Sequence, residues 1–160
     1  MFAGSYINVK APDSAGWLLS ESSYTGITFG KPGPSKRETF AAYVKGINLP
    51  PTASPSEFEE VTRVGFRNDT SPERFDVQRE ASRYTDERGY PCVRHEFLAR
   101  DKKPYGSDAP LLLAMDSLYC RHPKRQETGF VATFSFRGKD EYPQLRSEAE
   151  SFFQGAQVPD

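Results

Sequence analysis

The sequence predicts an α+β fold in which two principal helices pack on a mainly antiparallel sheet. Strand-like segments come in two runs separated by one helix, and a second helix closes the chain. The order lacks the strand-helix-strand alternation that builds parallel sheets. In addition, Leu111–Arg137 holds two β-rich runs around a Cys-Arg-His-Pro corner, and the second run alternates strictly. Such a period of two predicts a half-buried strand, with residues 130, 132, 134 and 136 on one face.

Length and composition indicate one globular domain. The chain has 160 residues, of which 36% are apolar and 13% aromatic. We expect a single domain over residues 1–160 with an ordered core of about 5–155, because this length buries a core without metal support. The longest apolar run, Leu111–Met115, is too short to span a bilayer. A net charge of -1 gives no long-range attraction to polyanions, so we predict no nucleic-acid partner.

The N-terminal third is expected to open with short strands. Tyr6–Lys10 alternates, and Gly16–Ser23 with Gly26–Lys31 has the pattern of a hairpin. Glu38–Val44 returns as a further strand after a Pro-Gly-Pro loop. The residues expected to point inward from the hairpin are Trp17, Leu19, Ile27 and Phe29.

A capping box marks the first helix. Ser54 is followed by a proline at the first helical position and by Glu57 three residues on. The helix is predicted to run to about Arg67. Its expected sheet-facing residues are Phe58, Val61 and Val64.

The second half supplies the remaining strands and the closing helix. Arg74–Tyr84 and Cys92–Leu98 have strand patterns, and Arg100–Pro110 is a loop rich in charge and proline. A helix is expected to start at Tyr142-Pro143 and to end before Gly155 as the C′ residue. Its apolar stripe consists of Leu145, Ala149, Phe152 and Phe153.

Cys92 and Cys120 are the two cysteines of the chain, and their spacing suggests a pair. Both lie 14 positions from residue 106, so symmetric pairing of their strands around that loop places them opposite each other. Opposed residues can be close enough for a disulfide, which we favour over two free thiols. The same register places Glu96 against Asp116, an unfavourable pair, so it leaves room for a bulge or slip.

A zinc site is the third reading of this corner. Cys92, His95, Cys120 and His122 are a zinc ligand set by type. Strand parity disfavours it, because residues three apart on an unbroken strand point to opposite faces. We therefore predict no metal and no cofactor.

No catalytic motif accompanies these residues. HExxH, GxSxG, phosphate-loop and calcium-loop patterns do not occur in the sequence. His122, which precedes a proline, is predicted to be a turn residue whose imidazole bonds a neighbouring carbonyl. The candidate binding residues are Tyr119, Arg121, His122 and Arg137.

Taken together, Gly16-Trp17, the Ser54-capped helix, the Tyr119–Pro123 run and Phe134–Gly138 resemble a group of proteobacterial cell-envelope lipoproteins. The order of elements is more distantly similar to the PsbP-type α/β/α sandwich, whose members are accessory and binding proteins. The lipoprotein resemblance implies export, an oxidised pair of cysteines and attachment through a lipidated cysteine upstream. The first residues show neither a signal peptide nor such a cysteine, so we expect either a mature exported form or a cytoplasmic protein.

These observations favour a non-enzymatic cell-envelope domain, periplasmic or envelope-attached, that binds a protein partner or a small ligand. Its contact with the membrane is expected only through the upstream lipid anchor. Two alternatives remain open. One is a small enzyme with a cleft near Tyr119, Arg121 and His122, and the other is a zinc-stabilised cytoplasmic domain.

Overall fold

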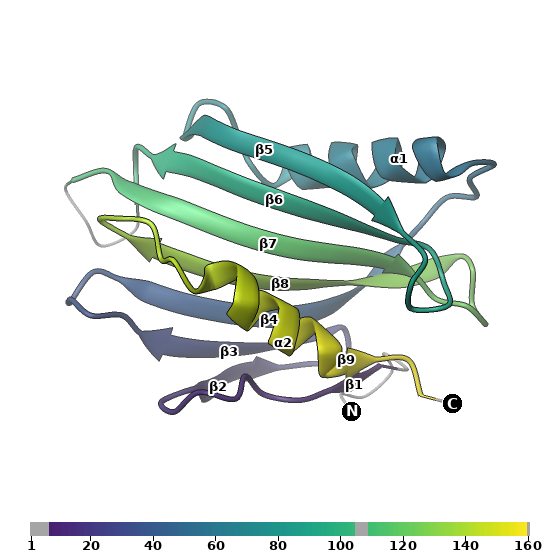
Figure 1. Cartoon of the computed structure of the whole chain (residues 1–160), viewed down its shortest axis with the longest axis horizontal. Coiled ribbons are helices and arrows are strands. Elements are labelled where there is room, and N and C mark those ends of the chain that lie inside the picture. The colour runs from purple at the N-terminus through teal and green to yellow at the C-terminus, as the bar shows by residue number, and fades with distance from the viewer. Residues whose placement is uncertain (1–6, 105–108, 160) are drawn as a thin grey trace.

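A seven-stranded antiparallel sheet forms the body of the protein in the computed structural model, which describes residues 7–104 and 109–159 (Figure 1). The strand order is β2-β3-β4-β8-β7-β6-β5, and every neighbouring pair is antiparallel. The predicted fold class is confirmed. The elements are β1 (Asn8–Val9), β2 (Leu18–Ser22), β3 (Gly26–Pro32), β4 (Thr39–Asn48), α1 (Pro55–Asn68), β5 (Phe75–Thr85), β6 (Cys92–Asp101), β7 (Leu111–Arg121), β8 (Thr128–Gly138), α2 (Leu145–Gln154) and β9 (Ala156–Gln157).

The two ends of the chain meet outside this sheet. β1 pairs antiparallel with β9, so the first predicted strand does not join the main sheet. Tyr6, its expected first residue, lies outside the described residues, as do positions 105–108 of the expected loop between β6 and β7. Neither described helix is long and apolar enough to cross a membrane.

The helices cover opposite faces of the sheet, α2 over β7 and β8, and α1 over β5 and β6 (Figure 1). Most of the central strand β8 is buried on both faces, with Phe134 1% and Thr133 0% exposed, and Phe66 of α1 belongs to the same buried cluster as Val131. This corrects the prediction of a half-buried strand, because alternation alone does not show whether a helix covers the second face. The predicted stripe of α2 does face the sheet, where Phe152 packs against Phe134 with ring centroids 6.3 Å apart.

The N-cap of α1 forms as predicted, with the Glu57 carboxylate accepting from the Ala53 amide instead of the Ser54 amide, but the helix faces the sheet with different residues. Ser54 Oγ accepts a hydrogen bond from the Glu57 amide at 3.1 Å. The residues buried under α1 are Phe58, Thr62 and Phe66. Val64 is 48% exposed, so its predicted position was wrong. These three residues are spaced four apart and therefore share one face of the helix. The polar one, Thr62, can be buried because its hydroxyl bonds to a histidine described below.

Three further expectations are corrected. Leu19 is 58% exposed because β2 is the sheet edge and has a bulge after this residue. α2 begins at Leu145 rather than Tyr142-Pro143, which form a turn whose Tyr142 carbonyl accepts from the Leu145 amide. Gly155 has a φ of -83°, so it is not a left-handed C′ residue. A Cβ there would lie 3.0 Å from that of Lys10, the residue after β1, and this close packing accounts for the glycine.

Candidate functional site

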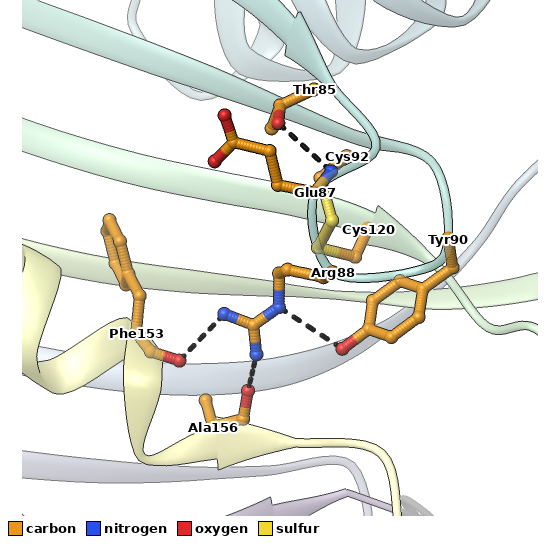
Figure 2. The surroundings of a disulfide bond; sticks show 8 residues. All are labelled: Thr85, Glu87, Arg88, Tyr90, Cys92, Cys120, Phe153 and Ala156. Carbon is orange, nitrogen blue, oxygen red and sulfur yellow. Dashed lines mark hydrogen bonds between the residues drawn. A yellow bond between two sulfur atoms is a disulfide. The ribbon is translucent and has the colours of Figure 1, made fainter.

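Cys92 at the start of β6 and Cys120 near the end of β7 form a disulfide, which Figure 2 shows. They occupy directly opposed positions, and both are fully buried. The β6–β7 register continues unbroken from this pair to Asp101 and Leu111. The symmetric register predicted from the spacing is thus the one the structure adopts.

The disulfide also removes the basis of the zinc reading. Both sulfurs are bonded to each other, so neither is a thiolate ligand. His95 points to the opposite face of β6, where its imidazole lies 3.0 Å from Thr62 Oγ1 and 2.9 Å from Ser82 Oγ. The alternation of side chains along β6 therefore places His95 and Cys92 on opposite faces of the sheet. No cluster of three metal-ligating side chains occurs in the described part of the chain.

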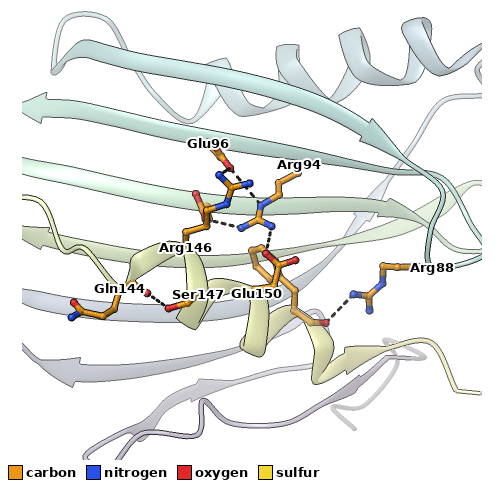
Figure 3. A network of polar contacts seen from close by, with 9 residues as sticks. Arg88, Arg94, Glu96, Gln144, Arg146, Ser147 and Glu150 are labelled. Atoms are coloured by element: carbon orange, nitrogen blue, oxygen red, sulfur yellow. Dashed lines mark hydrogen bonds and ion pairs between the residues drawn. The ribbon is translucent and has the colours of Figure 1, made fainter.

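Glu96 and Asp116 do stand opposite each other, and no bulge separates them. Arg94 lies beside both and relieves the repulsion, with its guanidinium 2.9 Å from Asp116 and 4.0 Å from Glu96. Figure 3 shows the same guanidinium reaching Glu150 of α2, at 2.6 Å. Burial still raises the pKa of Asp116, with Arg94 opposing and Glu96 adding to the shift. The register neither slips nor bulges here, because a buried arginine compensates the pair.

A second arginine fastens the corner to α2. Arg88, in the β5–β6 turn, donates to the carbonyls of Phe153 and Ala156 and to the Tyr90 hydroxyl (Figure 2). The Phe153 carbonyl lies in the last turn of α2, where a cation also interacts favourably with the helix dipole, and the Ala156 carbonyl lies at the start of β9. The disulfide and Arg88 together make this end of the molecule a structural anchor.

Arg121 lines a cavity of about 520 Å³ beneath the β4–α1 loop, but its donors are already used. It donates to the carbonyls of Gln126 and Pro50 and lies 3.2 Å from Thr52 Oγ1. Its guanidinium also stands 5.2 Å from the centre of the Phe58 ring. Arg121 therefore ties two loops to the end of β7 and has little left to offer a ligand.

His122 lines the same cavity and stabilises the β7–β8 turn, but through hydrogen bonds that differ from the predicted one. Its Nδ1 accepts hydrogen bonds from the amides of Lys124 at 3.1 Å and Arg125 at 3.2 Å. The ring thus caps amide groups of the β7–β8 turn through this nitrogen, instead of bonding a carbonyl as expected. A general base would need Nδ1 or its partner nitrogen aimed at substrate, and Nδ1 is committed to the turn.

Tyr119 and Arg137 line a different hollow, so the structure does not bring the four candidate residues together. This second site, called the α1 groove here, lies between the C-terminal end of α1 and the open half of the sheet and has a volume of about 280 Å³. Its lining residues are Tyr43, Lys45, Phe66, Asp69, Thr70, Arg74, Phe75, Leu113, Met115, Ser117, Tyr119, Ser135 and Arg137.

The strand register places Tyr119 and Arg137 at opposite ends of the α1 groove. Arg137 stands beside Leu113, and Tyr119 stands beside Val131, which also neighbours Lys45. Six residues along a strand separate the two rows, or about 20 Å. Between the two rows the groove is lined by Met115, Ser117 and Ser135, so its floor is partly polar.

The Arg137 end carries an uneven set of charges. Asp101 is fully buried and receives two hydrogen bonds from Arg74, at 3.0 and 2.9 Å. Arg137 approaches the same carboxylate at 3.3 Å. Burial works against ionisation of Asp101, but hydrogen bonds from Arg74 and the Lys103 amide outweigh it and lower the pKa of this carboxyl. One carboxylate thus serves two guanidinium groups.

The Tyr119 end presents hydroxyl groups. Neither Tyr119 nor Tyr43 forms a hydrogen bond through its hydroxyl within the described ranges. Burial raises the pKa of Tyr119, so its hydroxyl keeps its proton and remains a donor. Lys45 stands 5.6 Å from the centre of the Tyr43 ring.

Sequence reasoning found Tyr119 and Arg137 but missed the residues that surround them. Arg74, Lys45 and Tyr43 come from β4 and from the start of β5, far from the corner in sequence. The one available signal was parity, since Tyr43 and Lys45 share a strand face. That signal does not say which strand lies next to β8.

No family model and no curated protein matches the chain. Among solved structures, the solution structure of cyanobacterial PsbP (CyanoP) from Synechocystis sp. PCC 6803 is similar, with a TM-score of 0.59 and 16% identity over 97% of this chain and 88% of that chain. The crystal structure of LpqN, described as involved in cell envelope biogenesis of Mycobacterium tuberculosis, has a TM-score of 0.54 and 17% identity over 96% of this chain and 83% of that one. At these identities the likeness shows the fold, and the predicted PsbP-like topology is confirmed.

Proposed function

We propose that this chain is a non-enzymatic binding domain of the cell envelope and that the α1 groove is its binding site. One observation carries the proposal: the α1 groove offers hydrogen-bond donors that the protein itself leaves unused. The side chains of Arg137 and Tyr119 form no hydrogen bond within the described part of the chain, whereas those of Arg121 and His122 are committed to loops. Unused donors in a concave, partly apolar site are typical of ligand pockets.

The envelope assignment rests on the disulfide and on the fold. Structural disulfides persist in oxidising compartments, and this one is fully buried in the core. The likeness to LpqN, which is described as involved in cell envelope biogenesis, agrees with an exported protein. As in the lipoproteins that the Cys-Arg-His-Pro run resembles, attachment through a lipidated cysteine upstream of this sequence is part of the proposal.

The non-enzymatic character is supported by how the reactive side chains are used. His95 is 1% exposed and held between two hydroxyl groups, and Nδ1 of His122 accepts from its own turn. Asp116 is ion-paired with Arg94 in the core. Such residues stabilise the fold, and the α1 groove needs no cofactor to bind a small ligand or an exposed side chain of a partner protein.

The test is a fragment screen by NMR on the oxidised protein, repeated on two tryptophan variants. Ser135→Trp places an indole in the α1 groove, and Ser147→Trp places one on the exposed surface of α2 as the matched control. We expect fragments to shift amides along β7 and β8 in the parent and control and not in Ser135→Trp. Hits that cluster elsewhere, or that Ser135→Trp leaves unchanged, refute the site. Recovery of a chemically converted fragment refutes the non-enzymatic assignment.

A further inference from the structure

We infer that the α1 groove selects a ligand bearing an oxyanion, a carboxylate or a phosphate, and that this group sits against Arg137 and Arg74. The inference rests on the proposed function, since it names the ligand chemistry of the same site. Three features of the Arg137 end of the groove support it: an excess of positive charge, an unused guanidinium donor and apolar walls.

The first feature is the excess positive charge. Both oxygens of Asp101 are taken, Oδ1 by Arg74 and the Lys103 amide and Oδ2 by Arg74 and Arg137. Two guanidinium groups and one carboxylate leave one positive charge. Asp69, the other carboxylate beside the groove, forms no ion pair with the lining cations within 4.0 Å among the described residues. A bound oxyanion neutralises this excess.

The second feature is the incomplete bonding of Arg137. Its side chain is 25% exposed, and its contact with Asp101 at 3.3 Å is an ion pair without hydrogen-bond geometry. Its Nε is buried and has no hydrogen-bond partner. A buried donor without an acceptor is costly, and a guanidinium offers its donors as a planar fork that matches carboxylate and phosphate oxygens.

The electrostatic setting of Arg137 agrees with this arrangement. Burial and the neighbouring Arg74 lower the pKa of Arg137, and Asp101 opposes them only in part. The guanidinium remains charged but is poorly solvated. An incoming oxyanion therefore gains more from Arg137 than from a lysine or arginine on the open surface.

The third feature is the apolar wall, which describes the rest of the ligand. Leu113 stands beside Arg137, and Phe75 lies under the Arg74 guanidinium with the ring centre 5.0 Å away. Phe66 and Met115 continue the wall toward Tyr119. A volume of about 280 Å³ is just below the ligand-pocket range of roughly 300–1,000 Å³, so the groove holds only a small group. The expected ligand is a compact oxyanion on a flat apolar body, or the acidic end of a larger molecule.

The experiment is an NMR titration with three probes of similar shape: benzoate, phenyl phosphate and the neutral benzamide. We expect the two anions to bind at least about tenfold more tightly than benzamide and to shift the amides of Leu113 and Arg137. Arg137→Gln should weaken anion binding by about ten- to a hundredfold, as expected for loss of a charged hydrogen-bond donor. Arg137→Lys, which keeps the charge but not the fork, should show a smaller loss.

The control is Arg79→Gln, which removes an arginine that pairs with Glu141 at the other face of the sheet and should leave the affinities unchanged. The preferred anion assigns the source: tighter benzoate binding indicates a carboxylate ligand, and tighter phenyl phosphate binding a phosphate. If benzamide binds as tightly as the anions and only Ser135→Trp abolishes binding, the oxyanion inference is wrong but the α1 groove is still the binding site. If no probe shifts amides of the α1 groove, the oxyanion inference is also wrong. The fragment screen on the tryptophan variants then tests the binding site independently.

Discussion

Replacing His95 by glutamine should remove most of the acid sensitivity of the fold between pH 7.5 and 5. His95 joins α1 to the sheet: its ring stacks on Phe66 at 5.4 Å and bonds Thr62 and Ser82. The Thr62 hydroxyl donates to the Glu59 carbonyl, so it must accept from His95 Nε2. Nδ1 then accepts from Ser82, and the imidazole is neutral in the folded protein.

The expected magnitude follows from the pKa of His95. Burial, aided by the charge of Arg63, lowers this pKa from 6.5 to about 4. The unfolded chain therefore takes up a proton first, and the folded state loses stability as the pH falls from about 6.5 to about 4. At pH 5 the loss is about 2 kcal/mol relative to pH 7.5, and it approaches about 3 kcal/mol below pH 4.

The assay is urea unfolding of the parent and His95→Gln at several pH values between 7.5 and 5. The stability of the parent should fall more steeply, so the gap between the two proteins should narrow by about 2 kcal/mol at pH 5. Other shifted carboxyls cancel in this difference because both proteins contain them. Among these, Asp116 acts in the opposite direction, since its pKa is raised. Parallel stability curves over this range would show that His95 does not titrate as the structure requires.

Two further predictions concern the anchor and the charge network. Reduction of the Cys92–Cys120 disulfide, which joins residues 28 apart, or the double change to alanine, should lower the free energy of unfolding by about 3–4 kcal/mol in urea. An unchanged urea midpoint in reductant contradicts this. Arg94→Met should cost about 3–5 kcal/mol because it leaves Asp116 buried without its cation, and adding Asp116→Asn should restore part of the loss. If the double variant unfolds no later than the single one, Asp116 does not carry an uncompensated charge.

Local signals in the sequence predicted much of the fold. The Ser54 cap, the α2 stripe and the alternation of β8 each depend on residues within one or two turns or strands. The Cys92–Cys120 register was also predictable, because a single short connection between antiparallel strands constrains which residues face each other. Local patterns failed for Val64, whose burial depends on how α1 packs on the sheet, and for Leu19, whose exposure depends on β2 being the sheet edge.

The candidate site was predictable only in part. Tyr119 and Arg137 were identified, but so were Arg121 and His122, and residue type gave no means to separate them. Arg121 differs because it donates to the Pro50 and Gln126 carbonyls, and His122 because it accepts from turn amides. Only the folded loops bring these groups within reach.

The sequence by itself thus determined the class of fold, the helix start at Ser54 and the pairing of the two cysteines, since short-range periodicity and one strand connection are enough for these. Tertiary structure alone decided that β8 lies between β4 and β7, and so that Arg137 meets Arg74 at Asp101. Those three residues come from separate strands or their ends. Whether a charge is balanced or left over depends on neighbours that no local pattern specifies, and our proposal of the α1 groove as a binding site rests on that balance.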